Sequence, residues 1–195
     1  MKFLKTTWFK CIACLLVIAV VSGALLAMLN DLLYVSPETR TARAISKIYG
    51  EEKEYSTVID ADNGDSAIEY EGVGSVNKVY EIAGGDLLLQ TTGHQGYKNG
   101  TITLWIQVAK DGEKYSIEKV VLESSEKQTL MSKLSGEFYG GFKLTDVTET
   151  YNNGELFSAT DKDAKNYNPV SGASYSATAA ANAVNCVIKY LGGDK

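Results

Sequence analysis

The sequence predicts an α+β protein, with a mostly antiparallel sheet and a few helices behind one N-terminal transmembrane helix. Three observations lead to this prediction. An uncharged apolar run fills residues 11–29, and a helix needs roughly 20 such residues to cross a bilayer. In the middle of the chain, apolar and polar residues alternate within 101–109, as they do in half-buried strands. Near the end, over 177–191, apolar residues recur at helical spacings of three and four.

The N-terminal run predicts the compartment. Lys2, Lys5 and Lys10 precede it, so a cleaved signal peptide is the alternative interpretation. The run exceeds the roughly 7–15 residues of a signal-peptide core, which favours an uncleaved anchor. We therefore expect a cytoplasmic basic tail at 1–10 and a transmembrane anchor at 11–29, with the remaining chain outside the cytoplasmic membrane.

Residues 30–50 are expected to hold a connecting helix, and residues 51–195 an extracytoplasmic domain. Ser36 and Pro37 are typical of a helix start, and Gly50 of its end. Short runs bounded by Asp, Asn and Gly predict strands in the domain. These strands are expected at 55–59, 67–71, 79–82, 87–92, 101–109 and 115–123.

The second half of the domain is expected to add a hairpin turn at Asp111 and Gly112. A capping box at 125–128 predicts a short helix that stops near Gly136. A strand is then expected at 142–147, followed by a polar loop from Asn152 to Pro169. The final helix should end at two consecutive glycines, and one apolar face is expected to pack on the core: Ala177, Ala180, Ala181, Val184, Val187, Ile188 and Leu191.

Composition excludes several classes of function. The formal net charge is −5 and the pI about 5.0, so the chain has no basic surface for nucleic acid. Cys11 and Cys14 lie in the apolar run and Cys186 stands alone, which is not a disulfide framework. Apolar packing is the simpler interpretation of these cysteines.

Common catalytic motifs are missing. His94 is the single histidine, Gly-x-Ser-x-Gly does not occur, and no histidine-rich metal site can form. Ser124 and Lys127 match Ser-x-x-Lys, but the motifs that accompany it in penicillin-binding enzymes are missing. We therefore predict no catalytic residue and no metal ligand.

The stretch from Ser171 to Ser176, SGASYS, is the strongest candidate site. It combines three serine hydroxyls and small residues at the predicted start of the last helix. The first turn of a helix has free N–H groups and a partial positive charge, so it can hold an anion. A capped amphipathic helix without any ligand is the alternative interpretation, and the residues alone leave both open.

This stretch resembles the flavinylation motif of the FMN-binding domain found in the G subunit of Rnf electron-transport complexes. The C subunit of the sodium-pumping NADH:quinone oxidoreductase shares that domain. The family motif is Asp, two residues, Ser or Thr, Gly, Ala, then Thr or Ser, and its last hydroxyl carries FMN through a phosphoester. The resemblance extends over most of the chain. It includes Gly96, Tyr97 and Gly100 before a strand, and the hairpin that follows. Residues 123–134 lie where the family has a Glu-Thr-Pro-Gly-Leu-Gly loop.

The resemblance implies a site and partners. Ser174 would carry the FMN, surrounded by Ser171, Gly172, Ala173, Tyr175 and Ser176, with Leu130, Met131 and Tyr175 as walls and Thr129 and Ser176 as polar contacts. The chain would be an electron-transfer subunit that works with other membrane subunits of an ion-translocating complex. A separate FMN transferase would attach the cofactor.

Two positions depart from the family pattern. Asn168 stands where the motif has Asp, and Ser174 replaces the commoner Thr. These departures keep two alternatives in view. One is an extracytoplasmic binding or scaffold domain without redox activity, and the other is a stand-alone flavoprotein for extracellular electron transfer.

Overall fold

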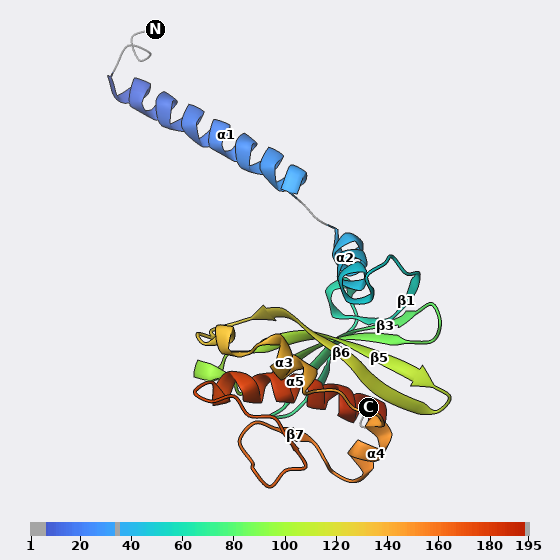
Figure 1. Cartoon of the computed structure of the whole chain (residues 1–195). Coiled ribbons are helices and arrows are strands. Elements are labelled where there is room, and N and C mark those ends of the chain that lie inside the picture. Colours follow the sequence, from blue (N-terminus) through green and yellow to red (C-terminus); the bar gives the residue numbers. More distant parts are fainter. Residues whose placement is uncertain (1–6, 34–35, 194–195) are drawn as a thin grey trace. The chain divides into compact units, whose positions relative to one another are not determined.

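The computed structural model describes residues 7–33 and 36–193, and the chain divides into two compact units between Arg40 and Thr41 (Figure 1). The helices are α1 (Thr7–Leu33), α2 (Pro37–Tyr49), α3 (Gly136–Gly140), α4 (Val147–Asn152) and α5 (Ser174–Gly192). The strands are β1 (Tyr55–Asp60), β2 (Ile68–Tyr70), β3 (Gly74–Ile82), β4 (Leu87–Gly93), β5 (Ile102–Asp111), β6 (Lys114–Ser125), β7 (Phe157–Ser158) and β8 (Asn166–Tyr167). Short 3₁₀ turns are η2 (Ala61–Asn63), η3 (Tyr97–Asn99) and η4 (Met131–Lys133).

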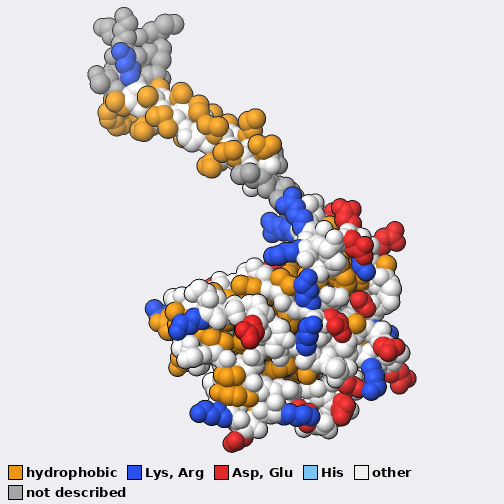
Figure 2. Space-filling model, in the orientation of Figure 1, with side chains coloured by type: hydrophobic (Ala, Val, Ile, Leu, Met, Phe, Trp, Pro, Cys, Tyr) orange, Lys and Arg blue, Asp and Glu red, His pale blue; other side chains and the backbone are white. Residues whose placement is uncertain are grey.

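Helix α1 is long and apolar enough to cross a membrane. Its candidate span, Lys10–Asn30, has 21 residues, and none of its most apolar window is buried. Figure 2 shows hydrophobic side chains all along this helix. The predicted anchor at 11–29 falls within α1. The predicted basic tail at 1–10 lies mostly outside the described residues.

A six-stranded, wholly antiparallel sheet forms the centre of the second unit. Its strand order is β1-β3-β4-β5-β6, and β2 also pairs with β3. Strands β5 and β6 form the predicted hairpin, with Asp111 opposite Lys114. These observations confirm the α+β class and the mostly antiparallel sheet. The parallel pair of β7 with β8 forms a small separate sheet.

Helix α5 covers one face of the sheet and packs on β3, β4 and β5 (Figure 1). Its alanines allow a close approach, and Gly93 of β4 lies directly under it. A Cβ at Gly93 would overlap the Ala179 carbonyl. Burial extends beyond the predicted face, because Ala179, Ala183 and Cys186 are also buried. Since α4 and β7 also contact α5, it is a core helix rather than a surface one.

Helix α2 covers the opposite face through Ile45 and Ile48, which pack on Tyr80, Leu88 and Trp105. Its start agrees with the sequence, since the Ser36 hydroxyl accepts a hydrogen bond from the Thr39 N–H at 3.2 Å. The second half of the predicted connecting segment is therefore packed against the domain.

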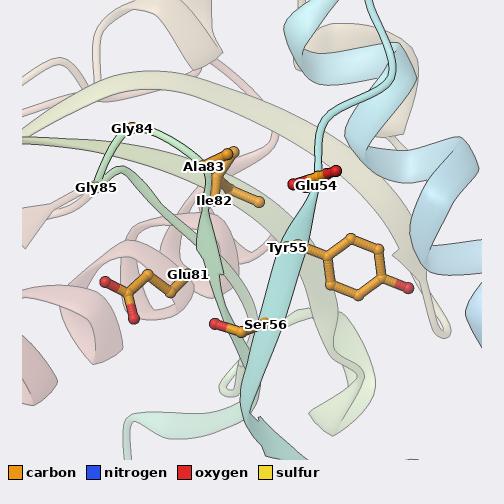
Figure 3. Close-up of a pocket in the computed structure, with 8 residues that line it drawn as sticks. All are labelled: Glu54, Tyr55, Ser56, Glu81, Ile82, Ala83, Gly84 and Gly85. Carbon is orange, nitrogen blue, oxygen red and sulfur yellow. The ribbon is translucent and has the colours of Figure 1, made fainter.

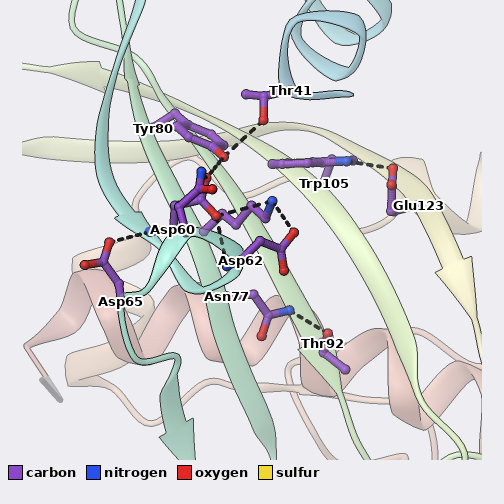
Figure 4. Close-up of polar contacts among 11 residues, drawn as sticks. Thr41, Asp60, Asp62, Asp65, Asn77, Tyr80, Thr92, Trp105 and Glu123 are labelled. Atoms are coloured by element: carbon purple, nitrogen blue, oxygen red, sulfur yellow. Dashed lines mark hydrogen bonds and ion pairs between the residues drawn. The ribbon is translucent and has the colours of Figure 1, made fainter. Parts of the chain in front are cut away.

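Polar side chains fill the space between α2 and the edge of the sheet (Figure 4). The Lys78 ammonium lies 3.4 Å from Asp60 Oδ1 and 2.6 Å from Asp62 Oδ2. The Tyr80 hydroxyl donates to Asp60 Oδ2 at 2.8 Å and lies 3.1 Å from the Thr41 hydroxyl. Because the Tyr80 proton is given to Asp60, Thr41 is the donor to Tyr80. The cluster ties α2 to β3 and to the end of β1.

Two local predictions are wrong. The capping box at 125–128 starts no helix, because Glu126 continues the β ladder with Thr101 in both directions at 2.9 and 3.2 Å. The 3₁₀ turn η4 takes the place of the expected helix. The strand predicted at 142–147 is a single bridge of Leu144 to Ile117, and Val147 already begins α4 behind an Asp146 cap. The polar segment 152–169 contains β7 and β8 but is otherwise irregular, as expected.

Candidate functional site

The stretch 171–176 lies at the first turn of α5, as the sequence predicts. Ala173 is the N-cap residue, and no side chain among the described residues caps this 19-residue helix. The Ala177 N–H bonds to the Ala173 carbonyl, so the regular helix begins at once. The first N–H groups of the helix therefore have no side-chain cap among the described residues, and an uncapped helix start is an arrangement that binds anions.

A hollow of about 210 Å³ opens beside this turn. Seven of the nine predicted site residues line it together with Tyr97: Thr129, Leu130, Gly172, Ala173, Ser174, Tyr175 and Ser176. Its volume is below the roughly 300–1,000 Å³ of sites that enclose a ligand. A ligand bound here would remain partly exposed.

Two predicted residues lie elsewhere. Met131, in η4, packs against the main core and does not line this hollow. Ser171 lines a neighbouring hollow of about 340 Å³ together with Lys133 and Asn168. The site therefore consists of the α5 start and the segment before η4, with Ser171 at its margin.

The three serine hydroxyls of the stretch differ in accessibility. Ser176 is 3% exposed, and its hydroxyl donates to Gln128 Oε1 at 2.8 Å. Ser171 and Ser174 are exposed. Ser174 is the exposed serine that both belongs to the first turn and lines the 210 Å³ hollow.

Exposed aromatic rings frame the hollow. The rings of Tyr97 and Tyr175 are 6.4 Å apart with planes tilted by 60°. Tyr175 is 66% exposed and Leu130 40%, which is unusual for large apolar groups in this domain. Tyr97 was not predicted as a site residue. The pair of glycines around it, Gly96 and Gly100, is the sequence signal that could have located it.

Positive charge lies next to the stretch. The Lys133 ammonium donates to the Ser171 carbonyl at 3.3 Å. Gly172 has a left-handed backbone, with φ of 73°, and a Cβ there would lie 2.6 Å from Lys133 Nζ. The ammonium thus sits over the turn that leads into α5. The Lys98 ammonium lies 5.5 Å from the centre of the Tyr97 ring.

Asn168 has a structural contact of its own. Its side-chain N–H donates to the Phe138 carbonyl at 3.1 Å, and its backbone N–H donates to the Ser158 carbonyl at 2.9 Å. The side-chain bond holds the segment before the site against α3. An aspartate carboxylate has no proton to donate at neutral pH, so it could not make this contact.

A larger hollow of about 380 Å³ lies at the sheet edge, where β1 meets the β3–β4 turn (Figure 3). Figure 3 shows that the side chains of Glu54, Tyr55 and Glu81 point in different directions. A binding site needs polar groups that converge on a ligand. This hollow is therefore a weaker candidate than the start of α5.

No group of three or more His, Cys, Asp or Glu that could hold a metal occurs in the part of the chain that the structure describes. Comparisons of the chain with protein-family models, curated proteins and solved structures find no match. A functional proposal for this chain therefore rests on the geometry of the α5 start and on the residues of the motif.

Proposed function

We propose that this chain is a membrane-anchored flavoprotein that relays electrons, with FMN attached to Ser174 through a phosphoester. One observation carries the proposal: Ser174 presents an exposed hydroxyl on the uncapped first turn of α5, at the edge of a hollow framed by two tyrosines. The resemblance of the sequence to the FMN-binding domain of Rnf G subunits supports the same site.

The residues at the turn fit a phosphate. A phosphodiester retains one negative charge, which free N–H groups at a helix start stabilise, and the Lys133 ammonium adds a positive charge nearby. The absence of a competing side-chain cap among the described residues leaves these donors available. Removing the Lys133 charge would therefore weaken anion binding without removing the attachment point.

The residues around the hollow fit a flat aromatic group. Tyr97, Tyr175 and Leu130 supply apolar surface, and the neighbouring Thr129 supplies a polar contact. FMN bound there would supply reversible electron transfer. Because the hollow is small, a ring bound in it would keep an edge exposed to an electron donor or acceptor.

Attachment requires one group-transfer step. The Ser174 Oγ forms a bond to the phosphorus of an activated flavin nucleotide, and the bond from that phosphorus to its leaving group breaks. The hydroxyl proton passes to a base of the separate transferase. No residue of this chain has to act as the base.

Helix α1 suggests where in the cell the electron transfer would take place. Helix α1 can hold the domain at a membrane, and the basic residues before it favour a cytoplasmic N-terminus and an extracytoplasmic domain. A covalent link would keep the cofactor on the domain outside the cell. Other membrane subunits of an Rnf-like complex would be the electron donor and acceptor.

A binding or scaffold domain without redox activity is the second candidate. Asn168 favours it, because the carboxylate of the flavinylation motif is replaced by an amide that is already bonded to Phe138. A transferase that needs the carboxylate would not modify this chain.

One experiment separates the two candidates. The full chain is expressed with a flavin transferase, denatured and examined for in-gel flavin fluorescence. We expect fluorescence in the wild type, in Ser171→Ala and in Ser176→Ala, and none in Ser174→Ala. A colourless wild type that also fails to bind added FMN would support the scaffold domain.

A further inference from the structure

Gln128 is hydrogen-bonded to three segments of the chain beside the candidate site. Its Oε1 accepts the Tyr97 backbone N–H at 3.1 Å and the Ser176 hydroxyl at 2.8 Å. Its Nε2 donates to the Glu126 carbonyl at 3.0 Å. One half-buried side chain therefore connects the η3 turn, the end of β6 and the first turn of α5.

The η3 loop is shaped to accept this side chain. A Cβ at either Gly96 or Gly100 would overlap Gln128 Nε2. The loop is closed by the Gly96 N–H, which donates to the Gly100 carbonyl at 3.0 Å. Glycine at both positions therefore lets the backbone approach the Gln128 side chain, because a side chain at either position would collide with it.

We propose that Gln128 is the positioning and selectivity residue of the site, an inference that rests on the proposed function. It fixes Tyr97 relative to Tyr175 at the mouth of the hollow. It also accepts the hydrogen bond that the Ser176 hydroxyl donates. Among the serines described in the first turn, Ser174 is then the one whose hydroxyl is available for attachment. Gln128 does not itself react with the cofactor.

The chemistry of the amide explains why a glutamine suits this position. Its oxygen accepts two hydrogen bonds while its nitrogen donates to a carbonyl. A carboxylate keeps the two accepted bonds but places a negative charge against the Glu126 carbonyl. Its negative charge would also partly cancel the positive potential at the start of α5, which an anionic ligand needs.

The first test needs no flavin. Amide hydrogen exchange is measured on the full chain in detergent for wild type, Gln128→Ala and Gln128→Glu, with Gln95→Ala as the matched control. The Gln95 side chain donates one hydrogen bond, to the Gly72 carbonyl at 2.6 Å, and it bonds to neither the Tyr97 N–H nor the Ser176 hydroxyl. We expect about tenfold faster exchange at Tyr97 in Gln128→Ala, because one hydrogen bond is lost, and no change at Tyr97 in Gln95→Ala.

Gln128→Glu provides a pH signature that a merely structural role would not give. At neutral pH its carboxylate repels the Glu126 carbonyl, so exchange at the β6 end should rise. Below a pH of about 4 the protonated acid can again donate, and wild-type exchange should return. A Tyr97 amide unaffected by both substitutions would overturn the proposal, whether or not the protein carries flavin.

The second test measures modification. With a transferase and limiting time, Gln128→Ala should load flavin several-fold more slowly than wild type and Gln95→Ala, and peptide mapping should detect a minor increment on Ser176. If Gln128→Ala loads flavin at the wild-type rate and carries it on Ser174 only, the selectivity role is overturned. If wild type takes no flavin, the proposed function fails, and the exchange experiment still decides the positioning role.

Discussion

The hydroxyl of Tyr80 donates a 2.8 Å hydrogen bond to Asp60 Oδ2, and both side chains are buried at the contact between α2 and the sheet (Figure 4). Burial raises the pKa of the Asp60 carboxyl, but the Tyr80 hydrogen bond, the Lys78 charge and the Asp62 N–H together lower it below its usual value. Burial raises the pKa of Tyr80, which stays protonated and remains the donor. Through Thr41, the pair connects α2 to the sheet.

Tyr80→Phe should therefore destabilise the domain. It leaves the Thr41 hydroxyl without its acceptor and removes one donor from a buried carboxylate, at a cost of about 1–3 kcal/mol in the free energy of unfolding. Urea unfolding of the full chain in detergent measures the cost. Tyr55→Phe is the control, because the Tyr55 ring packs edge-on against Tyr80 at 5.3 Å, whereas the Tyr80 hydroxyl is the group that bonds to Asp60 and Thr41. Equal effects of the two substitutions would contradict the role of the Tyr80 hydroxyl.

The lowered pKa of Asp60 predicts acid sensitivity. A carboxyl with a lower pKa in the folded state stabilises the fold above its unfolded pKa of about 4, and this contribution is lost as the pH falls through the folded pKa. The pKa of Asp146 is also lowered, by the Glu149 N–H and Lys114, so its contribution is lost in the same direction as the pH falls. Asp60→Asn should be less stable than wild type at pH 7 and lose less stability on acidification. An unchanged pH profile in Asp60→Asn would show that Asp60 does not contribute to it.

Asn168→Asp should destabilise the segment before the candidate site at neutral pH. The carboxylate would face the Phe138 carbonyl in place of the present N–H donor, at a cost of about 1–2 kcal/mol. This repulsion raises the pKa of the introduced carboxyl in the folded state. Stability relative to wild type should therefore be greatest below the unfolded pKa of about 4 and fall as the pH rises through the folded pKa. Thermal unfolding across pH 3–7 measures this, and a variant as stable as wild type at pH 7 would contradict the contact.

Asn185→Ala should be among the most damaging single changes in α5. The Asn185 side chain accepts the Phe157 N–H at 2.8 Å and donates to the Phe157 carbonyl at 2.9 Å, all within the core. Truncation leaves both backbone groups buried and unpaired, so a loss of about 2–4 kcal/mol is expected. Asn182→Ala is the matched control, with one half-buried bond to the His94 carbonyl. Chemical denaturation should separate the two variants clearly, and similar midpoints would refute the role of the Asn185 amide.

The spacing of apolar residues correctly predicted the strands and the helix that bury a regular apolar face. The strands at 87–92, 101–109 and 115–123 and the helix at 177–191 have strong patterns and match β4, β5, β6 and α5 to within a few residues. The prediction of 79–82 was too short for strand β3. A register shift between Val76 and Lys78 interrupts the alternation of apolar and polar residues in the first half of this strand. The short helices α3 and α4 were missed, since five or six residues give too little periodicity.

Local signals failed where the tertiary structure supplied the competing bonds. Ser125 and Gln128 carry the pattern of a capping box, but Glu126 pairs with Thr101 and Lys127 adopts a left-handed backbone. Much of the candidate site was predictable, because most of it is contiguous at the start of α5. Tyr97 was missed although Gly96 and Gly100 flank it in the sequence. Gln128 was missed because only the folded chain brings it beside Ser176.

The position of a flavin increment decides whether Ser174 carries the cofactor. The full chain is co-expressed with a flavin transferase, digested and mapped by mass spectrometry, with Ser174→Thr as a variant that keeps a hydroxyl. We predict an FMN phosphoester increment on Ser174 in wild type and on the introduced threonine in the variant, and none in Ser174→Ala. An unmodified Ser174 in wild type, under conditions in which the transferase modifies a known substrate, would contradict the proposed attachment.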